Sequence, residues 1–216
     1  MFAHARGKGV PSAEQARQVL WRLLDGAACG TALRDMLEQV ASPHMGWPLA
    51  YALAWISVAG GESVMPPWVR MQFPDAARMV KWLRDTACDA PDCAWCREKS
   101  DPVKALSRWF GFDGFRPTPN DAEGRPLQER IVDEGMRGNS LLGILPTGTG
   151  KSVCYQIPAL AKFERTGALT VVISPLVALM ADQVAGMERM GISSAVTVNG
   201  MLSLPERQDA LEKVRM

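Results

Sequence analysis

Apolar side chains in the first part of the chain recur three and four residues apart, which is the spacing of amphipathic helices. The pattern predicts helices over residues 13–24, 31–40, 48–58 and 75–86. Glycine and proline pairs at Gly60-Gly61 and Pro66-Pro67 separate the third helix from the fourth. We therefore expect a small all-helical unit over residues 12–86.

The pattern changes after a polar stretch that ends at Lys104. Short apolar runs then alternate with longer helical stretches. The run over residues 169–173, Leu-Thr-Val-Val-Ile, is continuous and rich in β-branched residues, which is typical of a strand buried on both faces of a parallel sheet. Residues 192–198 form a second such run. Strands that alternate with helices predict right-handed βαβ units.

Charge gives no indication of a broad nucleic-acid surface. The net charge is +1, and residues 1–100 carry 11 Lys/Arg against 10 Asp/Glu, while residues 101–216 carry 13 against 13. A surface for nucleic acid must therefore be local and must use backbone amides and hydroxyls as well as charge. No window reaches the ~18 uninterrupted apolar residues of a membrane span. We expect no membrane partner and a cytoplasmic location, in which the five cysteines stay reduced.

A glycine-rich turn between an apolar run and a helical stretch carries the clearest chemistry. It reads Leu145-Pro146-Thr147-Gly148-Thr149-Gly150-Lys151-Ser152. Gly148 and Gly150 permit the backbone angles and the close approach that a turn around phosphate needs. The helix that follows directs its free N–H groups at the same anion. The turn therefore predicts a site for a nucleoside triphosphate and Mg²⁺.

Individual residues of the turn have expected roles. Lys151 reaches the β- and γ-phosphates as the catalytic residue, and the Ser152 hydroxyl ligates Mg²⁺. The expected nucleotide-binding residues in the turn are Thr147, Gly148, Thr149, Gly150, Lys151 and Ser152. Leu145 stands where the general pattern begins with glycine. Kinases, motors and switches share this turn, and an ordinary glycine-rich turn with a surface lysine is the alternative.

Three cysteines, Cys88, Cys93 and Cys96, lie within nine residues. This spacing is typical of zinc chelation and also suits a four-cysteine iron–sulfur cluster. A fourth ligand is not local. Cys29 is the best candidate because it belongs to the same helical unit, whereas Cys154 follows the phosphate turn. Zn²⁺, an iron–sulfur cluster and unligated thiols all stay open.

Residues 110–128 resemble a known family. They read Phe-Gly-Phe-Asp-Gly-Phe-Arg-Pro-Thr-Pro-Asn-Asp-Ala-Glu-Gly-Arg-Pro-Leu-Gln, which is similar to the segment that opens RecQ-type DNA helicases of superfamily 2. In that family an aromatic–glycine element leads into Phe-Arg-Pro-x-Gln. The glutamine reads the adenine edge, since an amide can both donate and accept hydrogen bonds there. The resemblance gives this role to Gln128, 23 residues before Lys151, and places Arg125 at the nucleotide.

The chain departs from the family pattern upstream of Gln128. Phe115-Arg116-Pro117 repeats the Phe-Arg-Pro element, and a polar insertion, Thr118 to Gly124, separates it from the glutamine. Two questions therefore stay open: which arginine lies at the nucleotide and which phenylalanine stacks on the base. The alternatives are Arg116 or Arg125 for the first and Phe112 or Phe115 for the second.

The resemblance continues after the turn. Residues 152–160 are similar to the family's helix, and Ser174-Pro175-Leu176 resembles its strand-end motif, which grips the phosphates of single-stranded DNA. The position of this motif, directly after the predicted strand over residues 169–173, agrees with a binding role, because open α/β sheets bind ligands at the carboxyl ends of their strands. The implied fold class is α/β, a P-loop NTPase (RecA-like) parallel sheet with helices on both faces, truncated, and preceded by the small all-helical unit.

The resemblance also implies a division and a function. Residues 1–104 would be a helical N-terminal extension with the cysteine site, and residues 105–216 a helicase ATP-binding domain that is incomplete at its C-terminal end. The implied function is the ATP-binding and single-stranded-DNA-contacting part of an ATP-dependent DNA helicase that unwinds 3′ to 5′. ATP and Mg²⁺ are its cofactors. Its partners are single-stranded or partly duplex DNA and the rest of a helicase motor.

No Asp-Glu box and no second motor domain occur in the 216 residues. Because hydrolysis needs an acid that holds Mg²⁺ and orients water, the isolated chain is expected to be inactive. The extension loosely resembles that of DpdF-like helicases of bacterial 7-deazaguanine DNA-modification defence systems, and the pathway stays open between repair, recombination and phage defence. The alternative functions are a non-catalytic ATP- and DNA-binding regulatory fragment and a P-loop small-molecule kinase.

Overall fold

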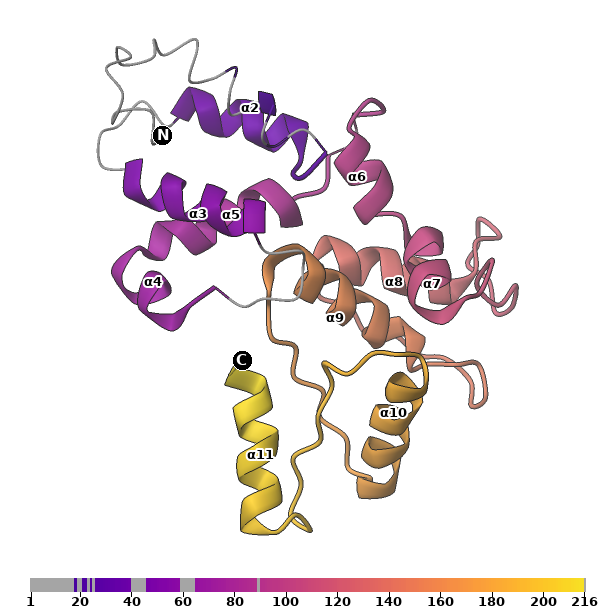
Figure 1. Ribbon diagram of the computed structural model, residues 1–216. Coiled ribbons are helices and arrows are strands. Elements are labelled where there is room, and N and C mark those ends of the chain that lie inside the picture. The colour runs from indigo at the N-terminus through magenta and orange to yellow at the C-terminus, as the bar shows by residue number, and fades with distance from the viewer. Residues whose placement is uncertain are drawn as a thin grey trace. The chain divides into compact units, whose positions relative to one another are not determined.

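The computed structural model describes residues 18, 21–22, 24, 26–39, 46–58, 65–88 and 90–215. The chain divides into two compact units, residues 1–58 with 67–96 and residues 59–66 with 97–216. Both are built from helices in their described parts (Figure 1). The division falls N-terminal to the boundary that the sequence predicts after residue 104. None of the described helices is long and apolar enough to cross a membrane.

The first unit is organised around one helix. Its helices are α2 (Gly30–Gln39), α3 (Gly46–Val58), α4 (Pro67–Gln72), α5 (Pro74–Asp85) and the first residues of α6 (Ala94–Lys99). α5 packs against α2, α3 and α4. Pro74 and Asp75 in its first turn suit a helix N-terminus. Arg84 on α5 lies between two indole rings, with its guanidinium carbon 5.5 Å from the Trp55 ring and 4.7 Å from the Trp95 ring.

The helices predicted from apolar spacing over 31–40, 48–58 and 75–86 are confirmed as α2, α3 and α5. The first predicted helix, residues 13–24, lies mostly outside the described residues, although the positions described within it are helical. Sequence reasoning missed α4, because it took the Pro66-Pro67 pair only as a chain breaker. Proline is equally suited to the first position of a helix, where no hydrogen bond to its nitrogen is needed.

The second unit contains α7 (Pro102–Phe110), α8 (Leu127–Arg137), α9 (Val153–Thr166), α10 (Val177–Arg189) and α11 (Leu204–Arg215). α8 packs against α9, and α7 packs against both. Their shared core consists of Ala105, Leu106, Val132, Met136, Ile157 and Ala161. α7 begins where Asp101 Oδ1 accepts hydrogen bonds from the N–H groups of Val103 and Lys104, at 2.9 and 3.0 Å.

Two features fix α9 against α8. The buried Arg165 guanidinium donates from Nη2 to the carbonyl oxygen of Met136 at 3.0 Å, near the end of α8. Gly135 allows close approach, because a Cβ there would lie 2.8 Å from Cγ of Pro158. The helix that follows the phosphate turn is therefore held firmly against the helix that carries Gln128.

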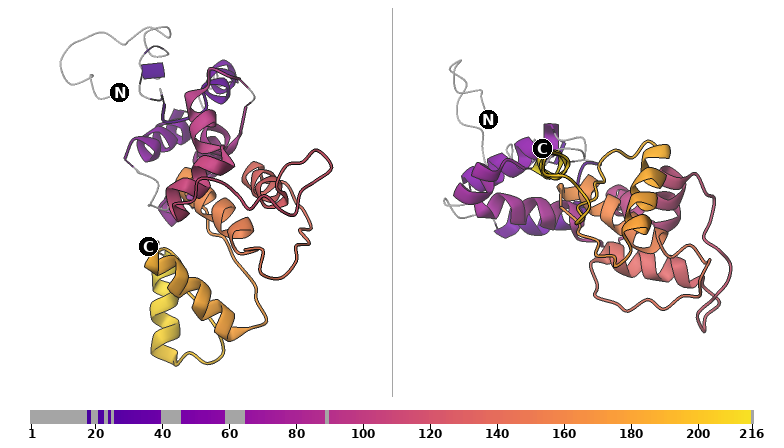
Figure 2. Two further views of the ribbon diagram at one scale, coloured as in Figure 1. Left: turned by 90° about the vertical axis from the view of Figure 1, so that its right-hand side faces the viewer. Right: turned by 90° about the horizontal axis from the view of Figure 1, so that it is seen from below.

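The predicted parallel sheet is not observed. Residues 140–146, 168–174 and 192–199 form no helix, but no strand is assigned within the described ranges, and neither Figure 1 nor Figure 2 draws an arrow. A single isolated bridge joins Asn120 and Pro126 in that part of the chain. Leu142, Ile144 and Ile173 are 87%, 79% and 92% exposed. An extended segment becomes a strand only through hydrogen bonds to a neighbour, and these segments lack that pairing among the described residues.

Candidate functional site

The glycine-rich turn has the conformation that its sequence predicts. Gly148 and Gly150 have φ angles of 77° and 75°, in the left-handed region that favours glycine. The turn leads directly into α9, and the Ser152 carbonyl accepts hydrogen bonds from the N–H groups of Tyr155 and Gln156, at 3.2 and 3.0 Å. The backbone therefore forms the turn-to-helix part of a P-loop.

Side chains of the turn are held by its own backbone. Lys151 Nζ donates to the carbonyl oxygen of Leu145 at 2.9 Å. Thr149 Oγ1 donates to the carbonyl oxygen of Pro146 at 2.8 Å. Thr147 and Gly148 are exposed at the tip. The ammonium group of Lys151 thus lies across the base of the turn, within the concave side where phosphate oxygens bind in loops of this kind.

Gln128 lies against the same turn and is buried, with 4% of its surface exposed. Its Nε2 donates to the carbonyl oxygens of Thr149 and Gly150, at 2.5 and 3.0 Å. Its Oε1 accepts a hydrogen bond from the Arg116 backbone N–H at 3.2 Å. A Cβ at Gly150 would lie 3.1 Å from Gln128 Nε2, so the close contact depends on glycine at that position.

The two arginines of the repeated element have different surroundings. Arg116 Nη1 donates to the carbonyl oxygen of Gly148 at 2.7 Å. Arg125 instead pairs with carboxylates of α8, from Nε to Glu129 at 2.9 Å and from Nη1 to Asp133 at 3.2 Å. Of the two, Arg116 is the one that contacts the phosphate turn.

The polar insertion, Thr118 to Gly124, forms a compact loop. Asp121 Oδ1 accepts hydrogen bonds from the N–H groups of Arg125 and Glu123, at 2.8 and 3.1 Å, and its backbone N–H donates to the Arg125 carbonyl at 2.9 Å. Burial alone would raise the pKa of Asp121, but these bonds and Arg130 outweigh it and lower the pKa below its usual range. The closed loop brings Arg116 beside Gln128. An Asp followed by glycine three residues later is a turn signal that could have predicted this closure.

The two phenylalanines also differ. Phe115 packs against the core of the second unit, whereas Phe112 is 55% exposed. Phe112 is therefore the one whose ring is available to a base.

The strand-end motif precedes α10. Ser174 Oγ accepts a hydrogen bond from the Leu176 N–H at 3.4 Å, and Pro175 and Leu176 are exposed. Gln183 on α10 accepts from Gln156 Nε2 at 2.8 Å and from the Tyr155 hydroxyl at 3.3 Å, both on α9. The helix after the phosphate turn and the helix after Ser174-Pro175-Leu176 are therefore directly linked.

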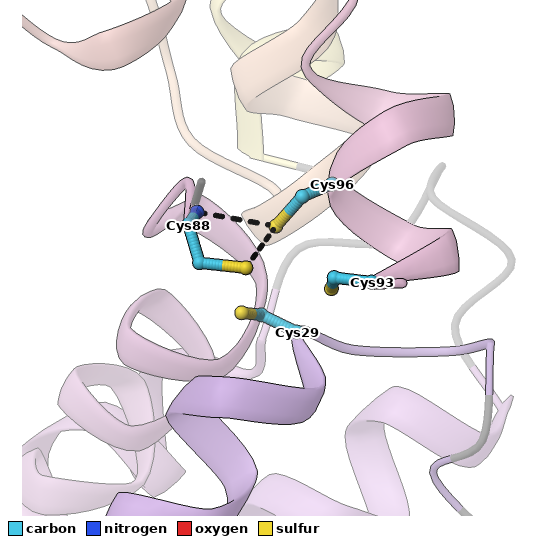
Figure 3. A group of neighbouring side chains, drawn as sticks. All are labelled: Cys29, Cys88, Cys93 and Cys96. Atoms are coloured by element: carbon cyan, nitrogen blue, oxygen red, sulfur yellow. Dashed lines mark hydrogen bonds between the residues drawn. The ribbon is translucent and has the colours of Figure 1, made fainter. Parts of the chain in front are cut away.

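A second cluster of functional groups lies in the first unit. The sulfur atoms of Cys29, Cys88, Cys93 and Cys96 all lie within 4.8 Å of one another (Figure 3). Three of the side chains are buried, and Cys88 is half-buried. Cys154 belongs to α9 in the second unit. Cys29, which the sequence favours as the fourth ligand, therefore lies near the other three.

The electrostatics of these thiols are uneven. Burial raises the pKa of Cys29 and of Cys96 above the usual value for a thiol. Burial would also raise the pKa of Cys88, but hydrogen bonds from the Thr31 side chain and the Ala90 backbone outweigh it and lower the pKa to about 7. Burial raises the pKa of Cys154 to about 11. Cys88 thus differs from Cys29, Cys96 and Cys154, whose pKa values burial raises.

Comparison with known proteins finds relatives of the C-terminal part of the chain. Residues 125–216 match the DEAD/DEAH box helicase family. The chain is 44% identical over 91 residues to human ATP-dependent DNA helicase Q4, 36% over 126 residues to ATP-dependent DNA helicase RecQ of Haemophilus influenzae, and 46% over 90 residues to ATP-dependent DNA helicase RecQ of Bacillus subtilis. These matches cover 42%, 58% and 42% of this chain.

The matched part is only 7%, 18% and 13% of the length of those three relatives, so the chain spans a small share of them. No solved structure matches the chain. The family match covers Gln128, the phosphate turn and the Ser174-Pro175-Leu176 motif. Residues 125–216 therefore resemble RecQ-like helicases of superfamily 2, a family that implies the P-loop RecA-like fold class.

Proposed function

We propose that residues 105–215 are the ATP-binding and single-stranded-DNA-contacting part of an ATP-dependent DNA helicase. The observation that carries the proposal is the contact of the Gln128 amide with the carbonyl oxygens of Thr149 and Gly150. This contact places the Gln128 amide, which can recognise adenine, beside the glycine-rich turn, which can hold phosphates. The names of the three relatives, all ATP-dependent DNA helicases, support the same conclusion.

In this proposal the turn binds the phosphates of ATP. Backbone N–H groups from Thr147 to Ser152 surround the β-phosphate, and Lys151 exchanges the Leu145 carbonyl for phosphate oxygens. The Ser152 hydroxyl would hold Mg²⁺, which would supply positive charge at the phosphates. The exchange is favourable because a hydrogen bond from ammonium to phosphate is charge-assisted at both ends, whereas the bond to a carbonyl is not.

Gln128 recognises the base, and Arg116 adds to the phosphate site. Adenine offers an acceptor and a donor on one edge, and an amide side chain complements both. Gln128 would exchange one of its hydrogen bonds to the turn for hydrogen bonds to adenine. Binding of the base would therefore change the contacts of the phosphate turn directly. The Arg116 guanidinium, 2.7 Å from the Gly148 carbonyl, is close enough to add positive charge at the phosphates.

We infer that residues 140–146, 168–174 and 192–199 are strands of a parallel sheet in the working helicase. Each segment is free of helix, and the helix α9, α10 or α11 follows it in the chain. Large apolar side chains on them, including Leu142, Ile144 and Ile173, are exposed. Pairing with one another and with the rest of the motor would bury this surface and satisfy the backbone groups.

The DNA contact is assigned to Ser174, Pro175 and Leu176. The second unit has no excess of positive charge, so the contact would use the Ser174 hydroxyl and backbone N–H groups rather than a basic patch. The hydrogen bonds from Gln156 and Tyr155 to Gln183 give a physical route between this motif and the ATP site. Unwinding from 3′ to 5′, and a cytoplasmic location, are what we propose for the whole helicase.

The test is a titration of the purified chain with a fluorescent ATP analogue in Mg²⁺. We expect Lys151→Ala to weaken binding by about tenfold or more, because a charge-assisted contact to phosphate is lost. Lys162→Ala is the matched control, since this lysine is on the same helix away from the turn, and its affinity should equal that of the unchanged protein. Equal affinity in Lys151→Ala would overturn the site, and phosphoryl transfer to a metabolite without DNA binding would favour a kinase.

A further inference from the structure

The four clustered cysteines come from separate parts of the first unit. Cys29 immediately precedes α2, and Cys88 follows α5. Cys93 immediately precedes α6, and Cys96 lies in the first turn of that helix. Figure 3 shows the four side chains gathered in one place, with the sulfur atoms of Cys88 and Cys96 next to each other. The Cys29 backbone N–H donates to the Leu83 carbonyl at 2.7 Å, which holds the start of α2 beside α5.

The spacing of the sulfur atoms suits a single metal ion. An ion bound tetrahedrally at about 2.3 Å from each sulfur holds the sulfurs about 3.8 Å apart. Here all four lie within 4.8 Å of one another, and Cys88 Sγ and Cys96 Sγ are 3.6 Å apart. In an iron–sulfur cluster the cysteines bind to more than one iron, so the width of the cluster separates them. The observed set is too compact for that arrangement without movement of the backbone.

Backbone N–H groups donate to two of the sulfurs. The Ala32 N–H donates to Cys29 Sγ at 3.5 Å, and the Cys88 N–H donates to Cys96 Sγ at 3.4 Å. Such bonds stabilise thiolates and orient them as metal ligands. Buried cysteines also occur as ordinary small apolar residues. Packing of that kind does not require four sulfur atoms from three chain segments to converge on one point.

We propose that Cys29, Cys88, Cys93 and Cys96 bind one Zn²⁺ as a closed tetrathiolate site. The ion replaces the thiol protons, which are released to solvent. Four protein ligands leave no open coordination position, so the site is structural and not catalytic. It ties the start of α2 to the α5–α6 connection. The site goes beyond the proposed helicase function, because it lies outside residues 125–216, where the helicase family matches.

A structural ion has a clear physical use here. A metal ion that binds only the folded first unit would add its binding free energy to the stability that the apolar core supplies. Removal of the ion is therefore expected to unfold or loosen the first unit. The phosphate turn belongs to the second unit, so ATP binding should persist. A loss of zinc with retained ATP binding distinguishes this proposal from the helicase proposal.

The test is metal analysis of the full 216-residue chain purified without added metal. We expect about one zinc per chain in the unchanged protein and in Cys154→Ser, and little or none in Cys93→Ser and Cys29→Ser. Replacement by Co²⁺ should give the intense visible absorption of a tetrahedral thiolate site. Bound iron, inorganic sulfide, or metal-free and well-folded protein would each overturn the proposal.

A second measurement covers variants that fail to fold. In the Cys154→Ser background the four remaining thiols are the proposed ligands. They should resist alkylation in the zinc-loaded protein, and all four should react after a chelator removes the ion. Equal reactivity before and after chelation would contradict the site, as would a Cys88–Cys96 disulfide in protein purified under reducing conditions.

Discussion

Arg116 Nη1 lies 2.7 Å from the carbonyl oxygen of Gly148, although 32 residues separate them in the chain. This contact, together with the Gln128 amide, ties the Phe-Arg-Pro element to the phosphate turn. It is possible because the insertion after Pro117 closes on Asp121 instead of extending away. The geometry therefore favours Arg116 over Arg125 as the arginine of the nucleotide site.

Arg116→Ala should weaken ATP binding by about three- to tenfold, because it removes a positive charge beside the phosphates. Arg125→Ala is the matched control. Its guanidinium pairs with Glu129 and Asp133, so its removal should lower stability slightly and leave ATP affinity unchanged. Titration with a fluorescent ATP analogue measures both. The reverse order of effects would show that Arg125 is the nucleotide contact.

Arg165→Met should lower the free energy of unfolding of the second unit by about 1.5–3 kcal/mol, because the Met136 carbonyl loses a buried, charge-assisted hydrogen bond. Arg189→Met, at an exposed position in the last turn of α10, should change it by less than about 0.5 kcal/mol. Urea denaturation followed by circular dichroism provides the comparison. Similar values for the two variants would mean that Arg165 does not hold α8 and α9 together.

Asp121→Asn should destabilise the second unit in a pH-dependent way. The pKa of Asp121 is lowered in the folded protein. Its ionised form therefore adds stability above the pKa of the unfolded carboxyl, about 3.9, and that stability is lost as the pH falls through the lower folded value. The difference in stability between the unchanged protein and Asp121→Asn should be constant from pH 5 to 7 and shrink below about pH 4.

The control for this prediction is Asp209→Asn, which changes an exposed carboxylate on α11. Its stability difference should be small throughout the range. A difference for Asp121→Asn that grows as the pH falls would contradict the role of the carboxylate in closing the insertion loop.

Local patterns predicted much of the helical structure and the turn. The backbone conformation of Gly148 and Gly150 was predictable, because a turn around phosphate needs positive φ angles and both residues have them. Apolar spacing located α2, α3 and α5. The spacing of Cys88, Cys93 and Cys96 indicated a ligand set, and membership of the same helical unit identified Cys29 as the fourth. That the four bind metal stays a prediction.

Three other features were left open or missed by the local patterns. The choice between Arg116 and Arg125 depends on the path of the insertion, which the hydrogen bonds of Asp121 set. The sheet depends on pairing between segments that each favour extended structure but need a partner to become strands. The short helix α4 was missed because the same prolines can end one segment and begin a helix.

The adenine preference of Gln128→Ala tests the central claim most directly. ATP and GTP affinities are measured in Mg²⁺ for the unchanged protein, for Gln128→Ala and for the surface control Gln208→Ala. Loss of two base contacts should cost ATP about 1–3 kcal/mol and GTP much less, so the preference for ATP should fall by about tenfold or more in Gln128→Ala alone. An unchanged ratio of the two affinities would mean that Gln128 only supports the turn, and would contradict the adenine-to-phosphate site.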